Sequence, residues 1–173
     1  LALPHLDTAM AQYESLGVVE RVATLRLVLN DAYAGLLRWP EVKALSDRQW
    51  ALRERIGDPG FALTVVNRHV RLLLALGRWR EAGELLADAR VRYAQLRPES
   101  LRYLHDIAAD LAWHEGRMAD AVASVDAALE KWPRDPSYDR YAYLILLRQR
   151  ALVALGRATE ATVASWLPER GDG

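Results

Sequence analysis

One short segment recurs along the chain and limits the folds that the sequence can adopt. It consists of the apolar end of a helix, a glycine, and the start of a second helix. The copies lie at residues 72–82 (LLLALGRWREA), 111–121 (LAWHEGRMADA) and 152–161 (LVALGRATEA). An earlier copy has Leu37 at the glycine position. The turns therefore fall at 37, 77, 116 and 156, with spacings of 40, 39 and 40 residues. A period of this length predicts stacked helical hairpins.

Glycine and proline residues predict where the helices begin and end. Asp58 is suited to cap a helix that starts at Pro59, where the missing N–H costs nothing. Asp135-Pro136 repeats this pair, and Arg97-Pro98 is expected to end the preceding helix. No segment alternates like a strand. We predict one all-α domain over residues 1–173: an orphan helix at 4–17 and hairpins at 19–57, 59–97, 99–133 and 137–167.

Small residues follow each turn and indicate close helix packing. The alanines lie five residues after the turn, at Ala82, Ala121 and Ala161. A small side chain there lets the second helix approach the first within the usual interaxial distance. The larger side chains two residues after the turn are expected to be buried over the open end of each hairpin. They are Trp39, Trp79 and Met118.

Composition excludes several classes of protein. The net charge is zero, with 23 basic and 23 acidic residues, which argues against a dedicated nucleic-acid surface. There is no cysteine, so disulfides and thiolate metal sites are excluded. The longest apolar runs, 72–76 and 141–147, are too short to cross a bilayer. No signal peptide is visible, and we expect a cytoplasmic location. Since the chain begins at Leu1 and almost directly in a helix, we expect it to be part of a longer protein.

No motif for catalysis or cofactor binding is present. The sequence contains no G-x-S-x-G, P-loop or H-E-x-x-H, so we expect neither enzymatic activity nor a cofactor. Asp106, Asp110 and His114 share one helix face at i, i+4 and i+8. These residue types can bind a divalent metal, but the outer two are about 12 Å apart along a helix. A polar stripe that pairs with Arg71 or Arg150 is therefore favoured over a metal site.

Two further polar features are more simply explained by structure. His69 lies between apolar residues and is expected to be packed or partly buried. Four arginines could contact phosphates, but neighbouring acids balance them, which favours a solvated helix face. The arginines are Arg68, Arg71, Arg78 and Arg80, and the acids are Glu81, Glu84 and Asp88.

The residues around the turns resemble the second helix of the tetratricopeptide repeat. The matching positions are Gly77, Trp79, Ala82, Leu86 and Ala89 in one hairpin, and Gly116, Ala121, Val125, Ala128 and Pro133 in the next. Two features depart from that repeat. The period exceeds the usual length of about 34 residues, and of the first-helix positions 30, 70, 109 and 149 only Ala109 carries the expected small residue. Longer repeats of this kind are similar to those in large bacterial transcriptional regulators of the maltose-activator and Streptomyces antibiotic-regulator types.

The resemblance implies an α-α superhelix with a concave groove lined mostly by the first helix of each hairpin. Carried over position by position, it places these residues in the groove: Asn67, Arg68 and Arg71; Tyr103, Asp106, Asp110, Trp113 and His114; Tyr143, Leu147 and Arg150. Aromatic, acidic and arginine side chains suit an extended peptide or a small polar effector. The alternative is a solvated concave face with ordinary ion pairs between repeats.

The resulting functional hypothesis is a non-enzymatic binding or sensor module of a bacterial transcriptional regulator. Its partner would be a protein, a peptide or a small effector in the groove, without direct nucleic-acid or membrane binding. Exposed apolar residues at the ends of the array, such as Trp132 and Trp166, could support self-association. One alternative is a scaffold or adaptor with no small-molecule ligand. Another is a hydrolytic or metal enzyme that uses Asp106, Asp110 and His114.

Overall fold

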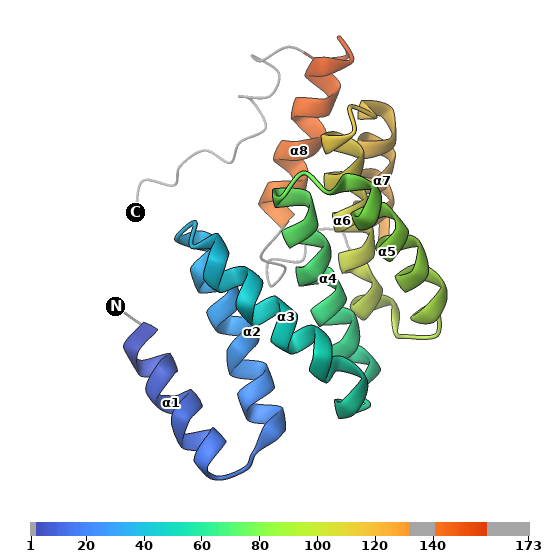
Figure 1. Ribbon diagram of the computed structural model, residues 1–173. Helices are drawn as coiled ribbons and strands as arrows, with labels where there is room; N and C mark the ends of the chain where they lie inside the picture. The colour runs from blue at the N-terminus through green and yellow to red at the C-terminus, as the bar shows by residue number, and fades with distance from the viewer. Residues whose placement is uncertain (1–2, 132–140, 159–173) are drawn as a thin grey trace, which may run out of the picture. The chain divides into compact units, whose positions relative to one another are not determined.

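The described part of the chain folds into consecutive α-helices (Figure 1). The computed structural model describes residues 3–131 and 141–158, and no strand occurs within these ranges. The chain divides into two compact units, Leu1–Leu76 (unit 1) and Gly77–Gly173 (unit 2). The all-α prediction is confirmed for the described part. The boundary lies at the Gly77 turn, so the hairpin predicted at 59–97 contributes one helix to each unit.

Unit 1 contains four helices, and each contacts the next (Figure 1). They are α1 (Leu3–Ser15), α2 (Val19–Gly35), α3 (Trp39–Ile56) and α4 (Pro59–Ala75). The apolar positions recur at helical spacing, so one stripe of each of α2, α3 and α4 is buried. Leu29, Val42 and Val65 are among the most buried side chains of these three helices. By contrast, α1 has no fully buried residue.

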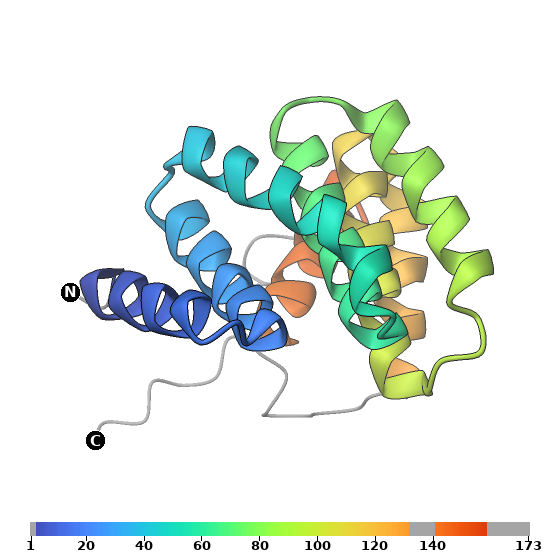
Figure 2. The same ribbon diagram turned by 60° about the horizontal axis from the view of Figure 1, so that its bottom comes forward.

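Unit 2 also contains four described helices: α5 (Trp79–Arg92), α6 (Pro98–His114), α7 (Met118–Lys131) and α8 (Tyr141–Ala154). α6 contacts each of the other three (Figure 2). Ala109, Val125 and Leu144 form the centre of one apolar cluster from α6, α7 and α8. Ala82 and Ala121 are completely buried, which confirms that small residues lie where the helices approach closely.

The turns have the backbone conformation that glycine favours. Gly77, Gly116 and Gly156 have φ values of 72°, 75° and 67°. Leu37, at the position where the earlier copy lacks glycine, adopts the same conformation with φ of 57°, and it is the one such non-glycine residue in the described ranges. After the Gly116 turn, the Arg117 N–H donates back to the Ala112 carbonyl at 2.8 Å. This bond closes the end of the helix and satisfies one of its free carbonyls.

An arginine follows each of the turns at 37, 77 and 116 and pairs with an acid three residues later. Arg78 Nε donates to Glu81 Oε1 at 2.7 Å, and Arg38 Nε donates to Glu41 Oε1 at 2.9 Å. Arg117 pairs with Asp120 in the same way. The Arg38 guanidinium lowers the pKa of the Glu41 carboxyl through this hydrogen bond. A carboxylate in the first turn of a helix also interacts favourably with the helix dipole.

The cap predicted at the start of α4 is confirmed. The Asp58 carboxylate accepts hydrogen bonds from the N–H groups of Gly60 at 2.7 Å and Phe61 at 3.2 Å, and Pro59 occupies the first turn. Gly57 ends α3 in the left-handed conformation, with φ of 70°. These local signals depend only on neighbouring residues.

Three expectations were wrong in detail. The orphan helix spans Leu3–Ser15 rather than 4–17. Arg97-Pro98 does not end α5, which stops at Arg92; Pro98 instead starts α6, because the first turn of a helix tolerates proline. Trp39 and Trp79 remain 37% and 41% exposed, since side chains at a helix start point back beyond its end.

Several predicted features lie outside the described residues. They are Trp132, Pro133, Asp135-Pro136, Ala161, Trp166, and the ends of the hairpins predicted at 99–133 and 137–167. In the part of the chain that is described, no helix has the length and apolar character needed to cross a membrane.

Candidate functional site

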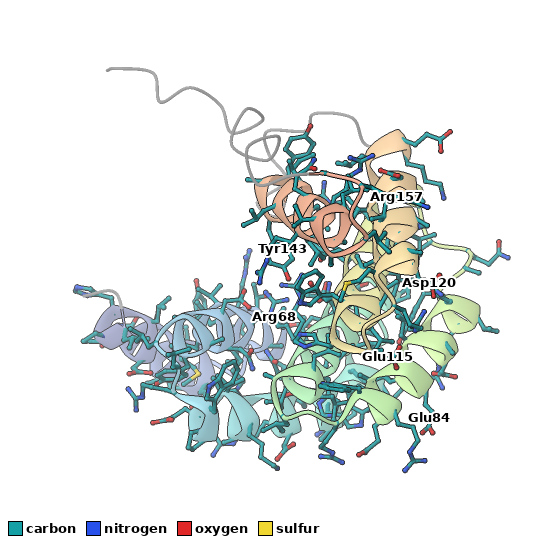
Figure 3. All side chains as sticks on the ribbon, turned by 90° about the horizontal axis from the view of Figure 1, so that it is seen from above. Arg68, Glu84, Glu115, Asp120, Tyr143 and Arg157 are labelled. Carbon is teal, nitrogen blue, oxygen red and sulfur yellow. The ribbon has the colours of Figure 1, made fainter. Side chains whose placement is uncertain are left out.

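The residues assigned to the groove are divided between the two units. Asn67, Arg68 and Arg71 lie on α4 in unit 1, and all the others lie on α6 or α8 in unit 2. Arg68, labelled in Figure 3, donates Nε to Asp31 Oδ1 of α2 at 3.0 Å and a second bond to Oδ2 at 2.5 Å. Asn67 is buried, and the Nε atom of Arg71 is also buried. The proposed single groove across these helices stays a prediction.

The candidate residues on α6 differ in how far they reach the surface. Asp106 is fully buried and Asp110 is 7% exposed. Tyr103 is half-buried, with the Arg102 guanidinium 5.2 Å from its ring centroid. His114 is exposed at the end of the helix, and its ring centroid lies 6.1 Å from that of Trp79. One helix stripe therefore holds both internal and accessible groups.

Four side chains join α6 and α8 at the surface of unit 2. The Tyr143 hydroxyl donates to the Asp110 carboxylate, and the Arg150 guanidinium lies 4.9 Å from the Trp113 ring centroid. We call Asp110, Trp113, Tyr143 and Arg150 the α6/α8 face. Tyr143 remains 40% exposed, and Figure 3 shows it on α8. Both contacts fix side chains that would otherwise lose rotamer freedom on binding a partner.

One groove assignment needs a correction. Leu147 was expected to line the groove, but it is only 4% exposed and packs with Ala109, Val125 and Leu144 in the core of unit 2. It lies between Tyr143 and Arg150 on α8, and the change from exposed to buried occurs within one helical turn. Leu147 therefore supports the face from below.

A partly buried stack of polar and aromatic side chains lies in unit 1. Ser46 Oγ is 2.9 Å from His69 Nδ1, and the Trp50 ring stacks on His69 with centroids 4.6 Å apart. The Arg53 guanidinium lies over the Trp50 ring, 3.7 Å from its centroid. His69 is half-buried, as predicted. A serine beside a histidine can act as a nucleophile, but Ser46 is 1% exposed, so a substrate has no access to it.

Two arginines of the predicted solvated helix face pair with nearby acids, as the balance of charge predicts. Arg78 pairs with Glu81, and Arg80 pairs with Glu84 at 3.2 Å. These contacts lie on the solvated side of α5. Within the described residues, no group of three or more His, Cys, Asp or Glu side chains is arranged to hold a metal ion.

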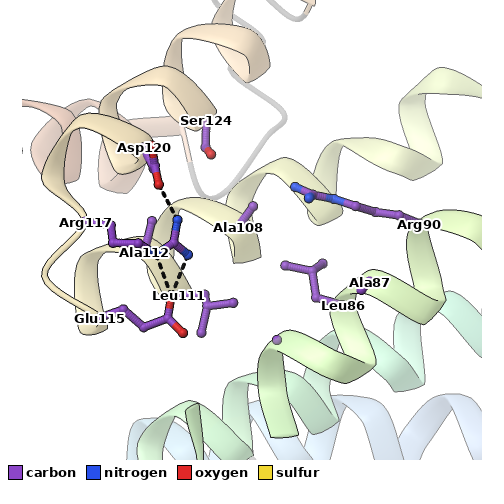
Figure 4. A pocket seen from close by; sticks show the side chains of 11 residues that line it. Leu86, Ala87, Arg90, Ala108, Leu111, Ala112, Glu115, Arg117, Asp120 and Ser124 are labelled. Atoms are coloured by element: carbon purple, nitrogen blue, oxygen red, sulfur yellow. Dashed lines mark hydrogen bonds and ion pairs between the residues drawn. The ribbon is translucent and has the colours of Figure 1, made fainter. Parts of the chain in front are cut away.

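A pocket of about 290 Å³ lies between α5, α6 and α7 in unit 2 (Figure 4). We call it the α5–α7 pocket. Leu86 and Leu111 give it apolar walls, and small residues leave the space between the helices open. Those small residues are Gly83, Ala87, Ala108 and Ala112. Its volume is at the lower limit for small-molecule sites.

The rim of the α5–α7 pocket carries charged groups. Arg117 is held by Glu115 at 2.5 Å and by Asp120, which both raise the pKa of its guanidinium (Figure 4). Arg90 reaches from α5 toward Ala108 on the other side. Within the described residues, Arg90 forms neither an ion pair nor a hydrogen bond.

Sequence reasoning missed this pocket. The sequence signal for it was the set of small residues on the facing sides of α5 and α6. The repeat pattern explains these residues equally well by close packing of the two helices.

No protein-family model matches the sequence, and no curated protein matches it.

Proposed function

We propose that this chain is a non-enzymatic binding module built from helical hairpins, and that it recognises a protein or peptide segment on the α6/α8 face. The finer architecture that we infer is a tetratricopeptide-like superhelix with a period of about 40 residues. In this proposal the module works in the cytoplasm as the sensor or interaction part of a bacterial transcriptional regulator.

One observation carries the proposal. Tyr143 and Arg150 are accessible, while Asp110 and Trp113 hold them in place from the neighbouring helix. Tyrosine, tryptophan and arginine contribute most of the binding energy in many protein interfaces. Side chains that are already ordered lose less conformational entropy when a partner binds. The α6/α8 face therefore has both the composition and the order that recognition requires.

The test is a selection of peptides followed by measured affinities. A random peptide library displayed on phage is selected on the immobilised chain, and the enriched peptides are synthesised with a fluorophore for anisotropy. The variant Tyr143→Ala/Arg150→Ala should weaken binding at least about tenfold, the effect of losing about 1.4 kcal/mol. Arg148→Ala is the matched control, because it lies on α8 but pairs with Asp126 of α7 at 2.5 Å. Equal affinities for the face variant and the wild type would refute the proposal.

The second candidate is a scaffold or adaptor without a small-molecule ligand. A thermal-shift screen of metabolites separates the two functions, because a ligand that binds only the folded state raises the melting temperature. A rise that disappears in Tyr143→Ala/Arg150→Ala supports an effector sensor at this face. Peptide binding without any response to metabolites supports the scaffold. A parent gene without a DNA-binding segment would count against the regulator.

A further inference from the structure

The α5–α7 pocket has a feature that helix packing does not explain. Gly83 lies inside α5 without a positive φ, so its backbone does not require glycine. A β-carbon added there would meet only the Leu111 Cδ2 atom, at the ordinary contact distance of 3.5 Å. Glycine within a helix is less favourable than alanine. The effect of the missing side chain at this position is to keep the pocket open.

The charges around the pocket are unequally satisfied. At one side of the rim Arg117 pairs with both Glu115 and Asp120, so this group carries one net negative charge. Arg90 stands at the other side, where its guanidinium has no acidic partner among the described residues. This guanidinium extends over the space toward Ala108 (Figure 4). An unneutralised guanidinium beside an apolar cavity favours an anionic ligand group, which it can bind with two parallel hydrogen bonds.

The charge of Arg90 also acts on a histidine of α6. Burial lowers the pKa of His105 on α6, and the charges of Lys131 and Arg90 lower it further. The effect requires Arg90 and Lys131 to be close enough to act on the same part of α6.

We propose that the α5–α7 pocket binds a small carboxylic acid with a short apolar body. The carboxylate contacts Arg90, and the apolar body lies against Leu86 and Leu111, where Gly83 leaves room for it. The volume of about 290 Å³ admits a ligand of this size. A phosphate ion lacks the apolar part and leaves most of the pocket unfilled. This site is separate from the α6/α8 face, so carboxylate binding in the pocket does not depend on the proposed peptide binding.

The test is an NMR titration of the full ¹⁵N-labelled chain with hexanoate. The amide signal of Gly83 and the Nε–H signal of Arg90 should shift together and saturate. Three further probes separate the contributions. Hexanol supplies the apolar body without the charge, hexylamine reverses the charge, and inorganic phosphate supplies an anion without the body. We expect each of them to bind at least about tenfold more weakly than hexanoate, the discrimination typical of a charge-assisted hydrogen bond.

Variants locate the site. Arg90→Gln should weaken hexanoate binding at least tenfold, while Arg92→Gln, on the same helix and outside the pocket lining, should leave the affinity unchanged. Gly83→Leu should abolish binding by filling the pocket, and circular dichroism verifies that it folds. If Gly83→Leu does not fold, Gly83→Ala serves in its place and should weaken binding while the fold is retained. Absence of saturable hexanoate binding, equal affinity for hexanol, or an unaffected Arg90→Gln variant would overturn the proposal.

Discussion

The same chemical change at two glycines of unit 2 should have opposite effects on stability. Gly116 ends α6 with φ of 75°, and nothing lies within 4 Å of a β-carbon added there. Gly116→Ala therefore introduces no clash, and its cost comes from the backbone. An L-residue in the left-handed conformation loses about 1–2 kcal/mol, and the lower entropy of the unfolded alanine chain returns about 0.4–1 kcal/mol. We expect a net destabilisation of about 1 kcal/mol.

Gly83 has the ordinary conformation of a helix interior. The new β-carbon of Gly83→Ala would contact Leu111 at 3.5 Å, without overlap. Alanine is about 0.8–1 kcal/mol more favourable than glycine within a helix. We therefore expect Gly83→Ala to raise the free energy of unfolding by about 0.5–1 kcal/mol. The two variants should differ by about 1.5–2 kcal/mol in opposite directions from the wild type.

Urea unfolding followed by circular dichroism at 222 nm measures both changes in the free energy of unfolding. The free energy of unfolding must fall with urea concentration at the same slope in the variants and the wild type. A changed slope means a changed unfolded state or a lost two-state transition. An unchanged Gly116→Ala variant would refute the assigned strain at this turn. A destabilised Gly83→Ala variant would mean that the space beside Gly83 is occupied by packed side chains, and it would also weaken the argument for an open pocket.

Three further predictions concern local structure. Leu37→Asn should stabilise the chain by about 0.5–1 kcal/mol, because asparagine tolerates the left-handed conformation better than leucine. The control is Leu36→Asn, where φ is −92°, and it should show no gain in stability in the same urea assay. Asp58→Ala should destabilise by about 1 kcal/mol through loss of the α4 cap, while Asp58→Asn should retain most of that stability. His105 has a lowered pKa in the folded state, so the unfolded state binds its proton more tightly and acidification favours unfolding. Stability should therefore fall as the pH drops below about 6.5, and a smaller fall is expected in His105→Gln; an identical pH profile would contradict this assignment.

The turns and the α4 cap could be predicted from sequence because they depend on short-range physics. A glycine after an apolar run, or Asp-Pro before one, specifies the backbone within a few residues. Leu37 shows how far this reasoning extends, since the repeat pattern predicted a turn and the chain adopts it without glycine. The end of α5 was misplaced because Arg97-Pro98 fits both the end of one helix and the start of the next.

The candidate site was less predictable because exposure depends on neighbouring helices. Tyr143, Leu147 and Arg150 share one stripe of α8, yet Leu147 is in the core and the other two are accessible. Helical spacing identifies the stripe, because successive residues are rotated by about 100° around the helix axis. It does not specify which residues of the stripe face the core and which face solvent. The packing of α6 beside α8 determines which of these side chains a ligand can reach.

The α5–α7 pocket was also not predictable from the sequence, because small residues on facing helices are compatible with two different packings. Alanine and glycine on facing helices allow close approach, and they equally allow an open space if the helices stay apart. Sequence alone favoured the first outcome at Ala82, which is completely buried, and that outcome was correct. One residue later along α5, Gly83 lines an open pocket. The distance between two helices decides between the two outcomes, and that distance is set by all the side chains along the interface rather than by the small ones.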